Sequence, residues 1–269
     1  MPSSLPSEIL DLIVDYLHDD PTALKTCCLL SKSWTSRTRT HLFSRVKFHL
    51  EKAPLKSWMK AFPDPSNSPA CYSSHLLICG PPVTVVAGID ARAWIRAFDH
   101  IVALKVDTGR GGDDQVSLIP LHGLSPTLKP LSLLFRSIPL SEIFDFVCSL
   151  PSLENLKLIS GGKDDEPSEW TTQTSPELTG ALYLLVEPSL GGIRTTVRRL
   201  LGLPGGLHFS KVQVSYPIED AESTRSLVSR CSGTLECLHV ACQFSSTFPY
   251  VTVCLLISHR CLRRRHHDL

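Results

Sequence analysis

The six residues LENLKL, Leu153 to Leu158, hold the pattern that decides the fold of this 269-residue chain. Leucine stands at the first, fourth and sixth places, and the last two leucines alternate with a lysine. Such alternation is typical of a short strand with one buried face. The preceding segment, Ser141 to Leu150, carries apolar residues at helical spacing. We therefore predict a helix followed by a strand at this point of the chain.

The same pattern recurs along most of the sequence. An apolar residue is followed, three and five places later, by two more, and successive copies begin 25 to 30 residues apart. The copy at Ser73 is weaker than the others. The first places of the copies are Phe43, Ser73, Ile101, Leu128, Leu153, Thr179, Phe209 and Leu235. Fixed spacing of this kind indicates a repeat architecture.

The interval and the Leu-x-x-Leu-x-Leu core are similar to those of leucine-rich repeats. Further helical stretches at Arg92–His100, Ile193–Leu201 and Glu219–Arg230 alternate with the predicted strands. Strand and helix alternating at one period favour an α/β fold with a parallel sheet in a curved solenoid. Since the asparagine expected after each strand is missing, we expect the solenoid to be irregular. Another α/β fold with short strands is the alternative.

A different pattern occupies Leu5 to Trp34, LPSEILDLIVDYLHDDPTALKTCCLLSKSW. Pro6 suits the first turn of a helix, since its missing N–H would be unpaired there. Asp20 and Ser31 are N-cap residues that start a second and a third helix, the third running toward His41. Three helices in so few residues form a bundle too small to bury all of its apolar side chains.

Five residues of this bundle stand out as surplus to its core: Leu5, Pro6, Ile9, Leu30 and Trp34. They could pack on the rest of the chain. They could also bind a partner, because an exposed apolar patch commonly marks an interface. The residues by themselves leave both readings open.

The bundle resembles an F-box, most closely that of the F-box proteins of mushroom-forming fungi. The resemblance rests on Leu5-Pro6, Glu8-Ile9-Leu10, Leu24, Leu30-Ser31 and Trp34, followed by His41-Leu42-Phe43. It implies a substrate receptor of a Skp–cullin–F-box ubiquitin ligase. The residues that it implies for binding the linker subunit are Leu5, Pro6, Ile9, Leu10, Leu24, Leu30, Ser31 and Trp34. We expect Ile13 and Leu17 to lie in the bundle core.

Composition narrows the remaining function classes. The chain has 27 basic and 26 acidic side chains, a formal charge of +1, so we expect no nucleic-acid partner. We find no run of about 18 apolar residues and no secretory signal, so we expect no membrane span. The ten cysteines then indicate reduced thiols in the cytoplasm, the nucleus or both.

Signatures of catalysis are missing from the sequence as well. No Ser/His/Asp or Cys/His set has a recognisable arrangement among the 11 histidines. The cluster Cys231, Cys237, His239 and Cys242 has spacings that match no common zinc finger. We therefore predict a protein that is not an enzyme and that has no cofactor and no metal.

These patterns divide the chain into three parts. We predict an F-box helical domain at 1–48, a leucine-rich-repeat-like solenoid at 49–245 and an atypical tail at 246–269, which we expect to be truncated or disordered. The expected partners are the linker subunit and an unidentified protein substrate. The alternative function is a repeat scaffold for protein–protein interaction, in which the helical bundle only caps the solenoid.

Overall fold

The protein is an α/β structure built on one open sheet. The computed structural model describes residues 6–49, 54–80, 91–108, 118–124, 126–135, 138–160, 176–186, 193–217, 221–243 and 251–256. Each strand pairs with the next strand along the chain, so the sheet order is the sequence order from β1 to β9. The predicted α/β class and the predicted parallel sheet are thereby confirmed for β1 to β8.

The strands are short and evenly placed along the chain. They are β1 (Arg45–His49), β2 (His75–Cys79), β3 (Ala103–Asp107), β4 (Pro130–Phe135), β5 (Asn155–Ser160), β6 (Ala181–Val186), β7 (Lys211–Pro217), β8 (Cys237–Gln243) and β9 (Val251–Leu256). The last strand, β9, runs antiparallel to β8 and lies within 246–269, the segment that we separated as an atypical tail. It pairs with the edge of β8 that would otherwise be open.

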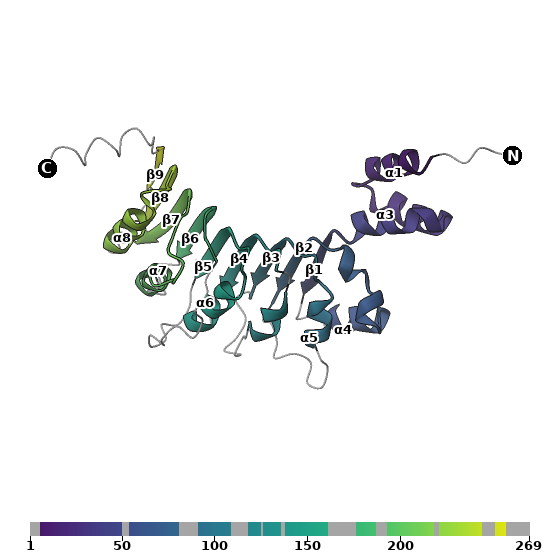
Figure 1. Cartoon of the computed structure of the whole chain (residues 1–269), viewed down its shortest axis with the longest axis horizontal. Helices are drawn as coiled ribbons and strands as arrows, with labels where there is room; N and C mark the ends of the chain where they lie inside the picture. Colours follow the sequence, from purple (N-terminus) through teal and green to yellow (C-terminus); the bar gives the residue numbers. More distant parts are fainter. Residues whose placement is uncertain are drawn as a thin grey trace.

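The described helices are α1 (Ser7–Tyr16), α2 (Pro21–Leu30), α3 (Lys32–Leu42), α4 (Pro54–Ala61), α5 (Ala91–Arg96), α6 (Leu140–Cys148), α7 (Ile193–Leu201) and α8 (Ala221–Cys231), with 3₁₀ turns η2 (Pro65–Asn67), η3 (Pro69–Tyr72) and η4 (Ile119–Gly123). Figure 1 shows the strands in an arc, with α4 to α8 along its convex side and α1 and α3 beyond the β1 end. None of the helices in the described residues combines the length and apolar character that a bilayer span needs.

The register of the sheet follows the apolar repeat. The first of the two alternating apolar residues in each strand pairs directly with its counterpart in the next strand. These residues are Val46, Leu76, Leu104, Leu131, Leu156, Leu182, Val212 and Leu238. All eight of these side chains are buried. Burying an apolar side chain of this size is worth about 1.5–3 kcal/mol, so the shared register stabilises every pair of neighbouring strands.

One copy of the repeat differs from the expectation. Thr179 was placed at the first apolar position before β6, but its side chain is exposed. Leu178 is fully buried instead and forms an isolated parallel bridge with Leu207. The sequence pattern was therefore wrong by one residue here, because the segment before β6 turns inward one position earlier than the other copies do.

Backbone hydrogen bonds join neighbouring copies at the amino ends of the strands. The carbonyl of Ser44 accepts from the amides of Ser74 and His75, at 3.0 and 2.9 Å. The carbonyl of Ser210 likewise accepts from Glu236 and Cys237, at 2.7 and 3.1 Å. Such bonds satisfy polar groups where neighbouring strands begin.

An aromatic cluster covers the convex side of the sheet at its β1 end. Trp58 of α4 contacts Phe43, Phe48, Phe62 and Phe98, with ring centroids 5.0 to 6.1 Å apart. Three of these four rings are tilted or edge-on at more than 50° to the Trp58 ring, the arrangement that aromatic pairs favour. The helix α4, which the repeat pattern did not predict, thus packs against the first strand.

Gly180 sits where the chain enters β6 and has no room for a side chain. A Cβ at this position would lie 2.4 Å from Oδ1 of Asn155 and 2.9 Å from the carbonyl oxygen of Glu154. Asn155 cannot swing aside freely, because its Oδ1 accepts a hydrogen bond from the Ala181 amide at 2.8 Å. We expect Gly180→Ala to lower the free energy of unfolding by about 1–3 kcal/mol in urea titrations, as overpacking does.

Gly233 supplies the matched control for this prediction. It lies in the turn after α8, and a Cβ there would meet no atom within 4 Å. Gly233→Ala should leave the urea midpoint close to that of the wild type. Equal midpoints for the two variants would contradict the steric explanation.

Candidate functional site

The first three helices form a compact unit, here called the helical block (Ser7–Leu42). The predicted helix starts are confirmed. The Asp20 carboxylate accepts hydrogen bonds from the amides of Thr22 and Ala23, both at 3.0 Å, and Pro21 is the first residue of α2. Ser31 caps α3 by accepting from the Ser33 amide at 3.3 Å. These N-caps start α2 and α3 shortly after the preceding helix has ended, so the three helices can fold back on one another.

The core of the helical block is very small. Its buried side chains in the described residues are Val14 of α1, Leu24 and Cys27 of α2, and Thr38 of α3. Both α1 and α2 pack on α3. Four side chains of moderate size cannot cover three amphipathic helices, so much of the apolar surface of the block stays in contact with solvent.

The exposed apolar residues of the block form two groups. On α1, Leu12 and Ile13 lie three and four residues after Ile9, and Tyr16 lies three residues after Ile13, which places all four on one side of the helix. At the end of α2, Leu29 is 88% exposed and Leu30 is 69% exposed. We call these six residues the apolar surface of the helical block. Large side chains with this degree of exposure are uncommon in a group unless they bind something.

The residues predicted to bind a partner occupy different environments. Pro6, Ile9 and Leu30 are exposed, while Leu10 and Trp34 are half-buried. Ser31 is half-buried, and its hydroxyl caps α3. Leu5 lies outside the described residues.

Two of these sequence predictions need correction. Leu24 is only 1% exposed, so it belongs to the core of the block and cannot contact a partner directly. Ile13 was assigned to the core but is 41% exposed, because α1 turns Val14 toward α3 instead. Leu17, also assigned to the core, is half-buried.

Sequence reasoning also missed three members of the apolar surface. Leu12, Tyr16 and Leu29 were assigned no binding role, although Tyr16 is 87% exposed. A helical projection groups Leu12 with Ile9, Ile13 and Tyr16, but it does not say which side of the helix faces α3. That choice depends on tertiary packing.

A cluster of charged residues ties α1 to α3. Arg37 donates two hydrogen bonds to the carboxylate of Asp15, at 2.6 and 2.5 Å, and Nε2 of His41 lies 2.7 Å from the same carboxylate. The hydrogen bonds from Arg37 and His41 hold the pKa of Asp15 well below its usual range. A bidentate pair of this kind fixes the orientation of α1 on α3, and with it the side that carries the apolar surface.

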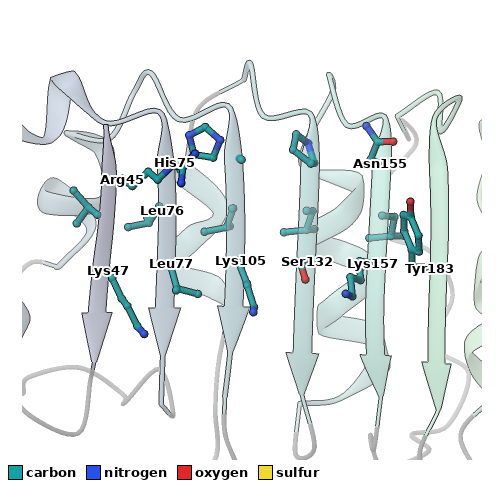
Figure 2. Close-up of a pocket in the computed structure, with 16 residues that line it drawn as sticks. Arg45, Lys47, His75, Leu76, Leu77, Lys105, Ser132, Asn155, Lys157 and Tyr183 are labelled. Carbon is teal, nitrogen blue, oxygen red and sulfur yellow. The ribbon is translucent and has the colours of Figure 1, made fainter. Parts of the chain in front are cut away.

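The concave face of the sheet forms a second candidate surface. An open groove of about 590 Å³ crosses β1 to β6 on the side away from α4 to α8. Figure 2 shows its outward-facing side chains, which include Lys47, Lys105, Lys157 and Tyr183. We call this the concave groove. Cys237 and His239, considered above as metal ligands, lie two strands beyond it on β8.

The chain matches no protein-family model, and no curated protein sequence matches it significantly.

The Asp15 cluster predicts a pH dependence of stability. Because the pKa of Asp15 is lowered in the folded state, its contribution is fully present above the unfolded value of about 3.9 and is lost as the pH falls toward the folded value. We expect Asp15→Asn to lower the melting temperature at pH 7. The difference from the wild type should shrink when the same thermal scans are run below about pH 4.

Asp11 is the control for this variant. It lies one turn earlier on α1 and makes no hydrogen bond to any residue of the described part of the chain. Asp11→Asn should change the melting temperature much less at pH 7. A pH-independent effect of Asp15→Asn would contradict the role given to its charge.

Leu24 and Leu30 give a test of core against surface within one helix. Leu24→Ala should lower the free energy of unfolding by about 2–5 kcal/mol, because it opens a cavity in the core of the block. Leu30→Ala should change it by no more than about 0.5 kcal/mol. Denaturant titrations of the two variants measure both values, and comparable losses would mean that Leu30 is buried in solution.

Proposed function

We propose that this chain is a non-catalytic adaptor of a Skp–cullin–F-box ubiquitin ligase. In this proposal the helical block is an F-box that binds the linker subunit, and the sheet belongs to a leucine-rich-repeat-like solenoid that binds a target protein. Parallel strands in sequence order and one shared register support the solenoid.

The observation that carries the proposal is the apolar surface of the helical block. Ile9, Leu12, Ile13 and Tyr16 lie along α1, and Leu29 and Leu30 end α2. In Figure 1, α1 and α3 lie beyond the β1 end of the sheet. A partner that covered these side chains would remove a large apolar area from water, which is the main favourable term in protein association.

The alternative role of the block, as a cap on the sheet, has less support. The convex side of the sheet at β1 is already covered by α4 and the aromatic rings around Trp58. The helical block contacts the part of the chain that contains the sheet through α3, which packs against η3. That contact attaches the block, but it leaves the apolar surface of α1 uncovered.

The mechanism that follows is one of proximity. A target held on the sheet and a linker subunit held on the helical block would be joined by a short connection, since α3 leads into β1 within three residues. Lysines of the target are then kept at a high effective concentration near the ubiquitin-carrying enzyme of the ligase. This chain contributes binding and position, and other subunits would carry out the transfer.

A capture experiment tests the proposal. The full chain, with an affinity tag, is co-expressed with a Skp-type linker subunit and purified. We expect the wild type to retain the linker subunit. The double variant Ile9→Asp and Leu30→Asp should lose at least about 90% of it, because two carboxylates would be buried without partners in the interface.

Leu185→Asp is the matched control. Leu185 is 44% exposed, close to the 43% of Ile9, but it lies on β6 of the sheet. This variant should retain the linker subunit in full. If the wild type retains none, the adaptor function is excluded and the scaffold alternative takes its place; if the control loses the linker equally, the helical block is not the binding site.

A further inference from the structure

The residues of the concave groove alternate between basic and neutral in a single row. Lys47 of β1, Leu77 of β2, Lys105 of β3, Ser132 of β4, Lys157 of β5 and Tyr183 of β6 are direct register neighbours. Figure 2 shows these six labelled side chains at the same level across the strands. The three lysines therefore stand two strands apart.

The groove is positively charged although the chain as a whole is nearly neutral. Of the described residues that line it, four are arginine or lysine and none is aspartate or glutamate. Arg45 and the three lysines of the row are exposed, and they form no ion pair with another residue of the described ranges. Just before β4 and β5, by contrast, Lys129 is paired with Glu154 at 2.8 Å.

We infer that the concave groove binds an acidic, extended segment of a partner protein that lies across the strands. This inference rests on the proposed function, because it describes the part of the target that the sheet would hold. Carboxylates of the segment would pair with Lys47, Lys105 and Lys157. The neutral side chains between them, Leu77, Ser132 and Tyr183, would contact the residues in between.

The spacing of the lysines sets the spacing of the acidic residues. Neighbouring strands lie about 4.8 Å apart, so lysines on alternate strands are separated by about 9.6 Å. A polyproline II chain has three residues per turn and rises about 3.1 Å per residue. Every third side chain therefore points the same way at intervals of about 9.3 Å. Acidic residues at positions i, i+3 and i+6 match the row of lysines.

Nucleic acid fits the same groove less well. Binding to a phosphate backbone depends on a large excess of positive charge, whereas the formal charge of this chain is only +1. Single-stranded nucleic acid also uses several aromatic rings as stacking platforms, whereas Tyr183 is the one aromatic residue among the described residues that line the groove.

Fluorescence anisotropy with the full chain tests the inference. The probe is a labelled peptide with the core Glu-Pro-Pro-Glu-Pro-Pro-Glu. The control peptide has the same composition but its three glutamates are adjacent, and an oligouridine is the third ligand. We expect the spaced peptide to bind at least about threefold more tightly than the clustered one, with affinity that falls as salt is raised. Equal binding of the two peptides, or tighter binding of the oligouridine, would overturn the inference.

Charge reversal locates the binding site. The triple variant Lys47→Glu, Lys105→Glu and Lys157→Glu should bind the spaced peptide at least about tenfold more weakly, because three exposed ion pairs are replaced by repulsion. The matched control, Lys25→Glu, Lys32→Glu and Lys60→Glu, changes the net charge equally but lies on α2, α3 and α4. It should bind like the wild type; if it is equally weakened, the groove is not the site.

Two further variants keep the outcomes separable. The triple variant Lys47→Gln, Lys105→Gln and Lys157→Gln removes the charges without adding repulsion. It replaces the glutamate variant if that variant does not fold. It should bind the spaced peptide at least about threefold more weakly than the wild type does. The double variant Ile9→Asp and Leu30→Asp should bind the spaced peptide like the wild type. If the wild-type chain captures the linker subunit but does not bind the spaced peptide, this inference alone is rejected. If it binds the spaced peptide but captures no linker subunit, the proposed function alone is rejected.

Discussion

The parallel sheet depends on one constraint, that two side chains of each strand from β1 to β8 must face the same buried layer. Val46 and Phe48 meet this requirement in β1, and Leu156 and Leu158 meet it in β5. Since side chains alternate along a strand, a slip of one residue would turn both apolar groups to solvent. The shared register of β1 to β8 therefore follows from the apolar pairs. Parallel neighbours also require a connection that crosses back over the sheet, which explains the interval of 25 to 30 residues.

The same alternation that builds the core also builds the concave groove. Residues between the buried positions, such as Lys105 between Leu104 and Val106, must point to the other face. Because the strands share one register, these outward residues fall into straight rows. Positive charge is thereby concentrated on one face of a chain whose acidic and basic residues nearly balance. A local surface property thus arises from the regularity of the fold.

The helical block follows a different rule. Its helices are only ten or eleven residues long, so they bury only a few side chains among themselves. Asp15 and Arg37 then fix how α1 lies on α3. The block is held in one orientation with its apolar surface outward, and this arrangement supports binding to a partner through a preformed surface.

How much of this could be read from the sequence differs between the two parts. The strand positions and most helices of the sheet followed from periodicity, because a buried pair such as Leu131 and Leu133 leaves a strong local signal. The antiparallel strand β9 and the helix α4 were not predicted, since neither follows the repeat. Leu178 replaced Thr179 because the path of the chain before β6 is set by its bridge to Leu207.

For the candidate surfaces, the sequence by itself determined which residues are apolar or charged and which helices carry them. It identified an excess of apolar side chains in the helical block from the small size of that block. Only the tertiary structure decided which of them are exposed: Leu24 turned inward and Ile13 outward because packing on α3 selects one side of each helix. The row of lysines likewise needed the strand register, since Lys47, Lys105 and Lys157 are far apart in the chain and are brought together only by the sheet.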